Sequence, residues 1–276
     1  MAGVPRLVDL CMAAIADELL GDGILEHIGC KNHLIKLTPD YLKFSNHCQQ
    51  FGVYARCCNL VREDADCLKQ ALVHMPNLQN LDLSDNSFED GIRSLISYFH
   101  EISGRDLPFS DLMLENCELT CNQVIELLGV LSTMKKPVNL LSIKGNRLGR
   151  YWTWFFWFLE ALREISTELK IAYINISNNQ GGIEAAKFMS SIISHSQKIV
   201  AIDARYNLMP TEALSVISSG MKASKGKLEH LDLAGNSLCD QLADAASVLA
   251  ELQIHGQCAL SLSLWAAPSA PYDDDP

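Results

Sequence analysis

Histidine and cysteine are the side chains of this 276-residue chain whose spacing could support chemistry. His27, Cys30 and His33 lie three residues apart, and imidazole and thiolate groups at such spacing can bind zinc. A structural zinc site usually has four ligands and a Cys-x-x-Cys pair, and neither occurs near this segment. We therefore expect no metal ion and no cofactor.

Two pairs of cysteines could act as nucleophiles, namely Cys57 with Cys58 and Cys117 with Cys121. A nucleophilic thiol needs a neighbouring base that removes its proton, and the sequence implies none for either pair. The chain also lacks a Walker-type glycine loop, a G-x-S-x-G motif and an H-E-x-x-H motif. These observations predict cysteines that pack in a core and a protein that is not an enzyme.

A repeated pattern determines where these cysteines lie. In the segment LQNLDLSDNSF, Leu78, Leu81 and Leu83 are followed by Asn86 and Phe88, which gives the pattern L-x-x-L-x-L-x-x-N-x-L. The first half is expected to be a short strand whose leucines point into one core by period-two alternation. The amide of Asn86 can bind the buried backbone groups of the turn that follows.

Further copies of this pattern follow along the chain. They begin at Phe109, Val138, Ile171, Ile199 and Leu228, and degenerate copies begin at Phe51 and Gln257. In the copy at Phe109, Cys117 occupies the asparagine position. In the copy at Phe51, we expect the pattern positions to be Tyr54, Arg56, Asn59 and Val61.

The copies begin 27 to 33 residues apart, which leaves room for a whole helix between strands. Apolar residues at helical spacing occur in 90–102, 121–134, 151–168, 183–195, 211–222 and 239–252. The pattern resembles the ribonuclease-inhibitor-like type of leucine-rich repeat. This resemblance implies an α/β solenoid, or horseshoe, with inner parallel strands and outer helices. We expect residues 51–265 to form this domain from about six to eight repeats.

The two ends of the chain lie outside the repeats. Residues 1–50 are expected to form a helical capping segment, because Pro5 can begin a helix and the residues after it form an apolar face. Residues 266–276 are expected to be a disordered acidic tail.

The spacing of Leu7, Cys11 and Ile15 resembles the elongin-C-binding box found in substrate receptors of cullin-RING ubiquitin ligases. The resemblance implies that this helix recruits elongin C and a cullin. Arg6 departs from the box, which usually has a small residue or proline there, and the cullin-selecting motif is only loosely matched. The alternative is that the helix covers the core at the end of the solenoid.

Composition and charge exclude several classes of function. The net charge is −11, with 33 acidic and 22 basic residues, so the chain has no basic stripe for nucleic acid. It contains no secretory signal and no apolar run of about 20 residues, which predicts a cytoplasmic or nuclear protein with reduced cysteines and no membrane span. The acidity favours solubility or a basic protein partner.

Residues that alternate with the core leucines are expected to face the concave side of the sheet. Concave surfaces of solenoids bind extended protein partners, although a face in contact with solvent alone would have the same polarity. The candidate partner-binding residues on this face are Asp82, Met113, Glu115, Ser142, Tyr173, Asn175, Asp203, Arg205, His230 and Asp232.

An aromatic cluster in RYWTWFFWFLEALREI supplies a second candidate surface. On a helix, Trp157 lies on the polar side, with Trp152 and Phe156 beside it. Exposed clusters of this kind anchor interfaces, and packing against a neighbouring helix is the alternative.

Two hypotheses for the function follow. The chain is either a non-catalytic scaffold for protein–protein interaction or the substrate-recognition subunit of a ubiquitin ligase. A third hypothesis is a GTPase-activating role, because Ran GTPase-activating proteins have similar repeats. Those proteins end in an acidic tail, and the terminal PYDDDP is too short to match one.

Overall fold

The computed structural model describes residues 51–238, except 59, 74, 150–154, 225 and 227, together with a strand at 259–261. Within these residues, eight parallel strands form a single sheet in which their spatial order is their order in the chain. The strands are β1 (Phe51–Tyr54), β2 (Leu78–Asp82), β3 (Asp111–Met113), β4 (Val138–Ser142), β5 (Ile171–Asn175), β6 (Ala201–Asp203), β7 (His230–Asp232) and β8 (Ala259–Ser261).

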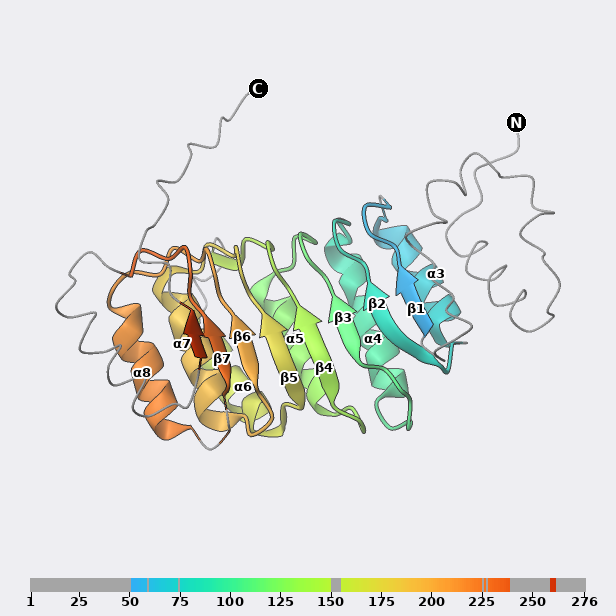
Figure 1. Cartoon of the computed structure of the whole chain (residues 1–276). Helices are drawn as coiled ribbons and strands as arrows, with labels where there is room; N and C mark the ends of the chain where they lie inside the picture. The colour runs from blue at the N-terminus through green and yellow to red at the C-terminus, as the bar shows by residue number, and fades with distance from the viewer. Residues whose placement is uncertain are drawn as a thin grey trace, which may run out of the picture.

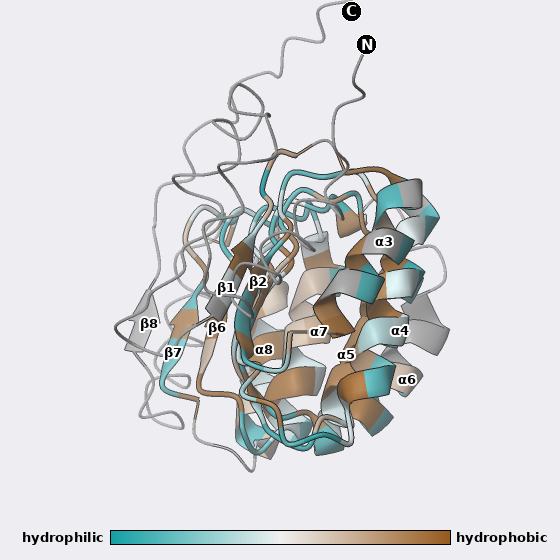
Figure 2. Cartoon of the chain, turned by 90° about the vertical axis from the view of Figure 1, so that its right-hand side faces the viewer, coloured by the Kyte–Doolittle hydropathy of each residue, from teal (hydrophilic) through white to brown (hydrophobic). Residues whose placement is uncertain are grey.

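Helices connect consecutive strands, because a parallel pair cannot be joined by a short hairpin. They are α3 (Arg62–Val73), the 3₁₀ helix η2 (Glu89–Gly91), α4 (Ile92–Ile102), α5 (Cys121–Ser132), α6 (Phe155–Glu168), α7 (Gly182–His195) and α8 (Ala213–Ala223). The strands lie side by side along one layer and the helices form a second layer behind them (Figure 1). Seen end-on, hydrophobic residues gather between the layers (Figure 2). None of the helices in the described ranges is long and apolar enough to cross a bilayer.

The register of the sheet confirms the sequence pattern from β2 onward. Leu81 pairs with Leu112, and Ile174 pairs with Ile202, so equivalent positions of the pattern lie side by side. The side chains of Leu81, Leu112 and Ile174 are completely buried between the strands and helices. The prediction of an α/β leucine-rich repeat solenoid with parallel strands and covering helices is therefore confirmed.

The predicted alignment of the first copy, beginning at Phe51, is wrong by one residue. Val53 rather than Tyr54 pairs with Leu81 and is buried, whereas Val61 is 48% exposed. The pattern positions of this repeat move from Tyr54, Arg56, Asn59 and Val61 to Val53, Ala55, Cys58 and Leu60. The sequence aligned Asn59 with the asparagine position, but a cysteine occupies that position here, as it does in the third repeat.

Asparagine side chains bind the turns of neighbouring repeats to one another. The buried Asn207 accepts hydrogen bonds at Oδ1 from the N–H groups of Asn179 (3.2 Å) and Gly181 (3.3 Å). Its Nδ2 donates to the carbonyls of Ile176 (2.9 Å) in the preceding repeat and Ala204 (3.1 Å) in its own. The asparagine position is occupied in successive repeats by Cys58, Asn86, Cys117, Asn146, Asn179, Asn207 and Asn236. One amide therefore satisfies buried backbone groups in two repeats.

Replacing Asn207 with alanine is expected to lower the free energy of unfolding by about 3–5 kcal/mol. The buried N–H groups of Asn179 and Gly181 lose their acceptor, and two buried carbonyls each lose one of two amide donors. Urea denaturation followed by circular dichroism measures the loss. The matched control is Asn122→Ala, at an exposed position in α5, which should change the free energy by less than about 0.5 kcal/mol. Equal effects of the two substitutions would contradict a structural role for the asparagine position.

Candidate functional site

The face of the sheet opposite the described helices presents side chains in three rows that run across the strands. The first row contains Asn80, Asp111, Leu140, Tyr173, Ala201 and His230. The second contains Tyr54, Asp82, Met113, Ser142, Asn175, Asp203 and Asp232. The third row lies two residues after the second row in each repeat. It contains Arg56, Ser84, Glu115, Lys144, Ser177, Arg205 and Ala234. All ten predicted concave-face residues belong to these rows.

The members of the predicted set differ in exposure. His230 is exposed, and Met113, Glu115, Tyr173, Asn175, Arg205 and Asp232 are partly exposed. Asp82, Ser142 and Asp203 are buried, at 9%, 3% and 4% exposure. A partner that contacts this face therefore meets the first row, all of whose members are at least partly exposed, more than the second.

The acidic and amide residues of the second row have a structural task. Four of these side chains each accept, at Oδ1, a hydrogen bond from the backbone N–H group two residues further on, at 2.9 to 3.1 Å. They are Asp82, Asn175, Asp203 and Asp232. This is an Asx-turn, which satisfies a backbone donor where each strand ends. The polarity of the row, which predicted a partner surface, thus has a second cause within the fold.

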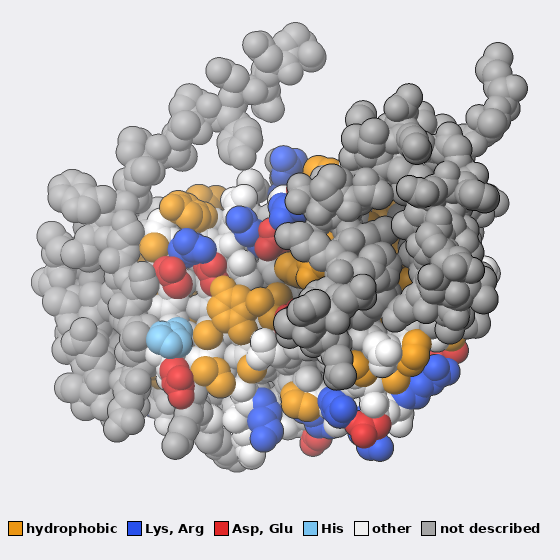
Figure 3. Space-filling model, turned by 45° about the vertical axis from the view of Figure 1, so that its right-hand side comes forward, with side chains coloured by type: hydrophobic (Ala, Val, Ile, Leu, Met, Phe, Trp, Pro, Cys, Tyr) orange, Lys and Arg blue, Asp and Glu red, His pale blue; other side chains and the backbone are white. Residues whose placement is uncertain are grey.

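Apolar side chains occupy the middle of the face. We define the central strip as Met113, Leu140, Tyr173 and Ala201, which come from β3, β4, β5 and β6. Leu140 pairs with Tyr173, and Tyr173 pairs with Ala201, so these three are direct neighbours. Each is partly exposed. Figure 3 shows hydrophobic side chains between charged ones on the visible part of the surface.

The predicted partner-binding set omits Leu140 and Ala201, although period-two alternation also places both residues on the concave side. The signal that could have found them was the repeat register, because it places Leu140 and Ala201 on either side of Tyr173. Burial raises the pKa of the Tyr173 phenol, and the Asp203 carboxylate raises it further. Tyr173 therefore presents a neutral ring and hydroxyl.

Arg205 lies at one end of the central strip in a cluster with two carboxylates. Its Nη2 and Nε bind the two oxygens of Asp203 at 2.7 and 3.0 Å, and its Nε lies 3.5 Å from Asp232 Oδ2. The hydrogen bond to Asp203 raises the pKa of Arg205. The bidentate geometry fixes the orientation of a side chain that is still 43% exposed.

A second arginine lies among the first repeats. Arg56 binds Asp85 at 2.5 Å, and a second guanidinium nitrogen lies 3.6 Å from Glu115. Burial lowers the pKa of Arg56, but the hydrogen bond and charge of Asp85 outweigh this effect and raise it. Burial alone would raise the pKa of Asp85, whereas hydrogen bonds from Asn116 and Arg56 bring it below its ordinary value. The face thus carries cations that are held by its own acids.

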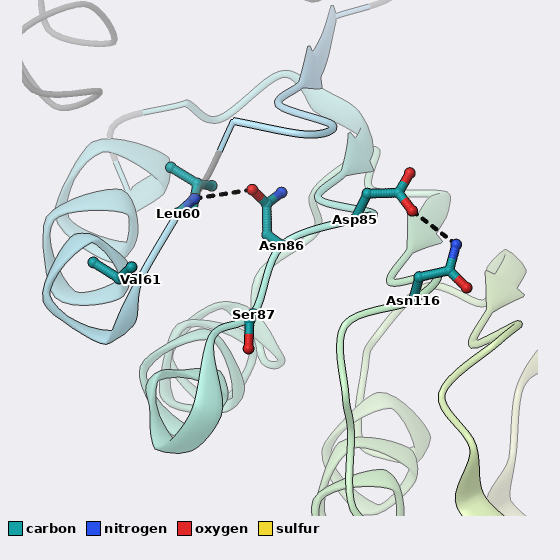
Figure 4. A pocket seen from close by; sticks show the side chains of 6 residues that line it. All are labelled: Leu60, Val61, Asp85, Asn86, Ser87 and Asn116. Carbon is teal, nitrogen blue, oxygen red and sulfur yellow. Dashed lines mark hydrogen bonds between the residues drawn. The ribbon is translucent and has the colours of Figure 1, made fainter. Parts of the chain in front are cut away.

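A pocket of about 410 Å³ lies at the edge of the first repeats and is lined by Leu60, Val61, Asp85, Asn86, Ser87 and Asn116 (Figure 4). Its polar groups are engaged within the fold, since Asn86 Oδ1 accepts the N–H of Leu60 at 3.0 Å and Asn116 donates to Asp85 at 2.7 Å. The pocket is therefore a recess between successive turns, with no charged group directed at a ligand.

The described cysteines are free thiols with different surroundings. Burial raises the pKa of Cys117 to about 12 and those of Cys58 and Cys121 to about 11, so these thiols are protonated at neutral pH. Cys117 donates a hydrogen bond to the carbonyl of Leu83 at 3.3 Å. Within the described ranges, no three His, Cys, Asp or Glu side chains are grouped as ligands for a metal ion.

Several predicted residues lie outside the described part of the chain or lack described side chains. Leu7, Cys11, Ile15 and Trp152 are outside it, as are the predicted cap and the acidic tail. Phe156 and Trp157 belong to the first turn of α6, of which the structure describes only the backbone. The aromatic surface and the adaptor-binding helix remain predictions.

A family model described as Leucine Rich Repeat matches residues 77–99, which cover β2, η2 and most of α4. A comparison with curated proteins gave no match. The match covers one repeat, and together with the observed solenoid it supports the fold of a leucine-rich repeat protein, a class whose repeats generally serve as non-catalytic interaction domains.

The surroundings of the thiols predict their reactivity. Iodoacetamide at pH 8 is expected to modify the tryptic peptide 57–62, which carries the exposed Cys57, and to leave peptide 106–135, with Cys117 and Cys121, unmodified. The thiolate fraction at the latter two becomes large only as the pH approaches 11 to 12. Mass spectrometry of the digest measures both peptides, and labelling in urea is the control. Rapid labelling of peptide 106–135 in the folded chain would contradict the protonated, buried state.

Proposed function

We propose that this protein is a non-catalytic interaction scaffold that binds an extended protein segment along the open face of its sheet, with Tyr173 as the anchor. The observation that carries the proposal is the central strip, where side chains from four consecutive strands form an apolar area inside a charged surround. Interfaces commonly have this anatomy, with an aromatic residue at the centre and a polar rim.

The surrounding charges favour a basic partner. On the three rows, five carboxylates (Asp82, Asp111, Glu115, Asp203 and Asp232) accompany three cations (Arg56, Lys144 and Arg205). Two of these cations already lie against acids of the same face, Arg56 beside Glu115 and Arg205 on Asp203. The excess of negative charge attracts lysine and arginine side chains to the rim and raises the rate of association with a basic segment.

We also infer that the repeats are of the ribonuclease-inhibitor-like type. The support is that an α-helix follows each strand from β1 to β6, and that the repeats are long enough to hold one. Packed helices need about 10 Å of spacing while strands need about 5 Å, so this arrangement curves the sheet inward. A concave face suits a partner that lies along it.

Replacing Tyr173 with alanine is expected to weaken partner binding at least about tenfold, because a central aromatic side chain is removed from the interface. Affinity purification of the tagged chain with quantitative mass spectrometry identifies the proteins that are lost. Glu126→Ala, at an exposed position of α5, is the matched control and should retain them. Unchanged recovery of every protein with folded Tyr173→Ala would rule out the central strip as the binding surface.

The finer hypothesis is that the chain is the substrate receptor of a cullin-RING ubiquitin ligase. Its support is the sequence resemblance of Leu7, Cys11 and Ile15 to an elongin-C-binding box. If it holds, elongin C and a cullin co-purify with the wild type and disappear with Leu7→Ala/Cys11→Ala, while circular dichroism shows a folded chain. Tyr173→Ala should retain elongin C and lose the substrate. Absence of elongin C from the wild-type sample would refute the ligase role.

A further inference from the structure

Each turn that leaves the sheet contains a residue in the left-handed conformation, one position before the asparagine position. The φ angles lie between 51° and 72°. The residues are Cys57, Asp85, Asn116, Gly145, Asn178, Tyr206 and Gly235. Glycine, asparagine and aspartate tolerate this conformation, and they fill five of these places. Tyr206 is the bulkiest exception.

A second left-handed position follows the asparagine position in the middle repeats. Glu118, Arg147, Gln180 and Leu208 occupy it, with φ between 53° and 58°. Among these four, only Leu208 is apolar. The sixth repeat therefore places an aromatic and an aliphatic side chain at two successive strained positions of one turn, where the fifth repeat has Asn178 and Gln180.

Both side chains are directed to solvent. Tyr206 is 57% exposed and Leu208 is 58% exposed. Side chains that remain more than half exposed gain little from burial, while a left-handed conformation destabilises an ordinary L-residue. Their presence is therefore not explained by the stability of the repeat, and strained exposed residues of this kind are typical of functional surfaces.

The next repeat holds the tyrosine ring in place. Gly235 lies beneath it, since a Cβ atom on this glycine would lie 2.3 Å from ring atoms of Tyr206. The backbone N–H of Tyr206 also binds the carbonyl of Ala234 at 3.1 Å. Tyr206 thus presents an oriented ring at the edge of the sheet, where a partner can pack against it without first ordering it.

The charges beside this edge indicate what the partner must carry. Arg205, the chain neighbour of Tyr206, is held by Asp203 and lies near Asp232. Two carboxylates thus surround one guanidinium, and Asp232 is 32% exposed at its side chain. The cluster carries net negative charge immediately next to the apolar pair.

We propose that Tyr206 and Leu208 form a docking edge for a protein segment in which an apolar side chain lies within a few residues of a lysine or arginine. The apolar side chain packs on Tyr206 and Leu208, and the cation lies beside Asp232. This inference rests on the proposed function, because it assumes that the repeats bind a protein. It concerns the edge of the sheet, however, and does not require binding at the central strip.

The test uses a random-peptide library displayed on phage and selected on the full-length chain. Selected peptides are synthesised, and their dissociation constants are measured on the wild type, on three variants of this edge and on Tyr173→Ala. Tyr206→Asn/Leu208→Gln introduces residue types that the fifth repeat carries at the equivalent left-handed positions, so the chain should fold with an unchanged or higher Tm. Asp232→Asn removes the proposed partner of the cation. Gln180→Asn is the matched edge control.

The proposal expects peptides that pair an aromatic or aliphatic residue with a nearby lysine or arginine. Their affinity should fall at least about tenfold with Tyr206→Asn/Leu208→Gln, several-fold with Asp232→Asn, and not with Gln180→Asn. Failure to select any binding peptide, or equal affinity for the wild type and the folded double variant, overturns it. Peptides that lose affinity for Tyr173→Ala and not for the double variant would also overturn it, while supporting the central strip as the binding surface.

Discussion

The hydrogen bonds of the asparagine position are the interaction on which the rest of this solenoid depends. Each turn leaves the sheet with buried N–H and C=O groups that no regular ladder can pair, and one amide supplies both an acceptor and two donors. Because Asn207 binds groups of its own repeat and of the one before it, the amide also aligns successive turns. Cys58 and Cys117 are the described exceptions, and a thiol forms only weaker bonds there.

This alignment leaves only part of each repeat available for function. Apolar residues, mostly leucine and isoleucine, fill the core side of the strands from β1 to β7, and the Asx-turns use several polar residues of the opposite side. What remains on the open face is the central strip around Tyr173 and the charged side chains at its margins. An interaction surface can therefore vary among such proteins while the scaffold is unchanged, because the side chains at the surface positions take no part in the hydrogen bonds of the asparagine position.

The turns illustrate the same separation between scaffold and surface. Their left-handed conformations suit asparagine, aspartate and glycine, which occur in most repeats. Gly145 is an example, since a Cβ atom there would lie 1.9 Å from Asn116 Oδ1 of the preceding turn. Tyr206 occupies the corresponding place in the sixth repeat at the expense of local backbone strain, and the ring is accommodated only because Gly235 follows in the next repeat.

The sequence by itself determined the solenoid, because leucine and asparagine recur at positions that have one structural meaning. It also determined the strand register from β2 to β8. It misplaced the first repeat, where Cys58 takes the place of asparagine. Only the tertiary structure decided which outward residues are accessible. Asp82 and Asp203 are buried by their own turns and neighbours, whereas Leu140 lies beside Tyr173 across 33 residues of chain. Periodicity specifies the side of a strand on which a residue lies, but exposure depends on side chains contributed by neighbouring repeats.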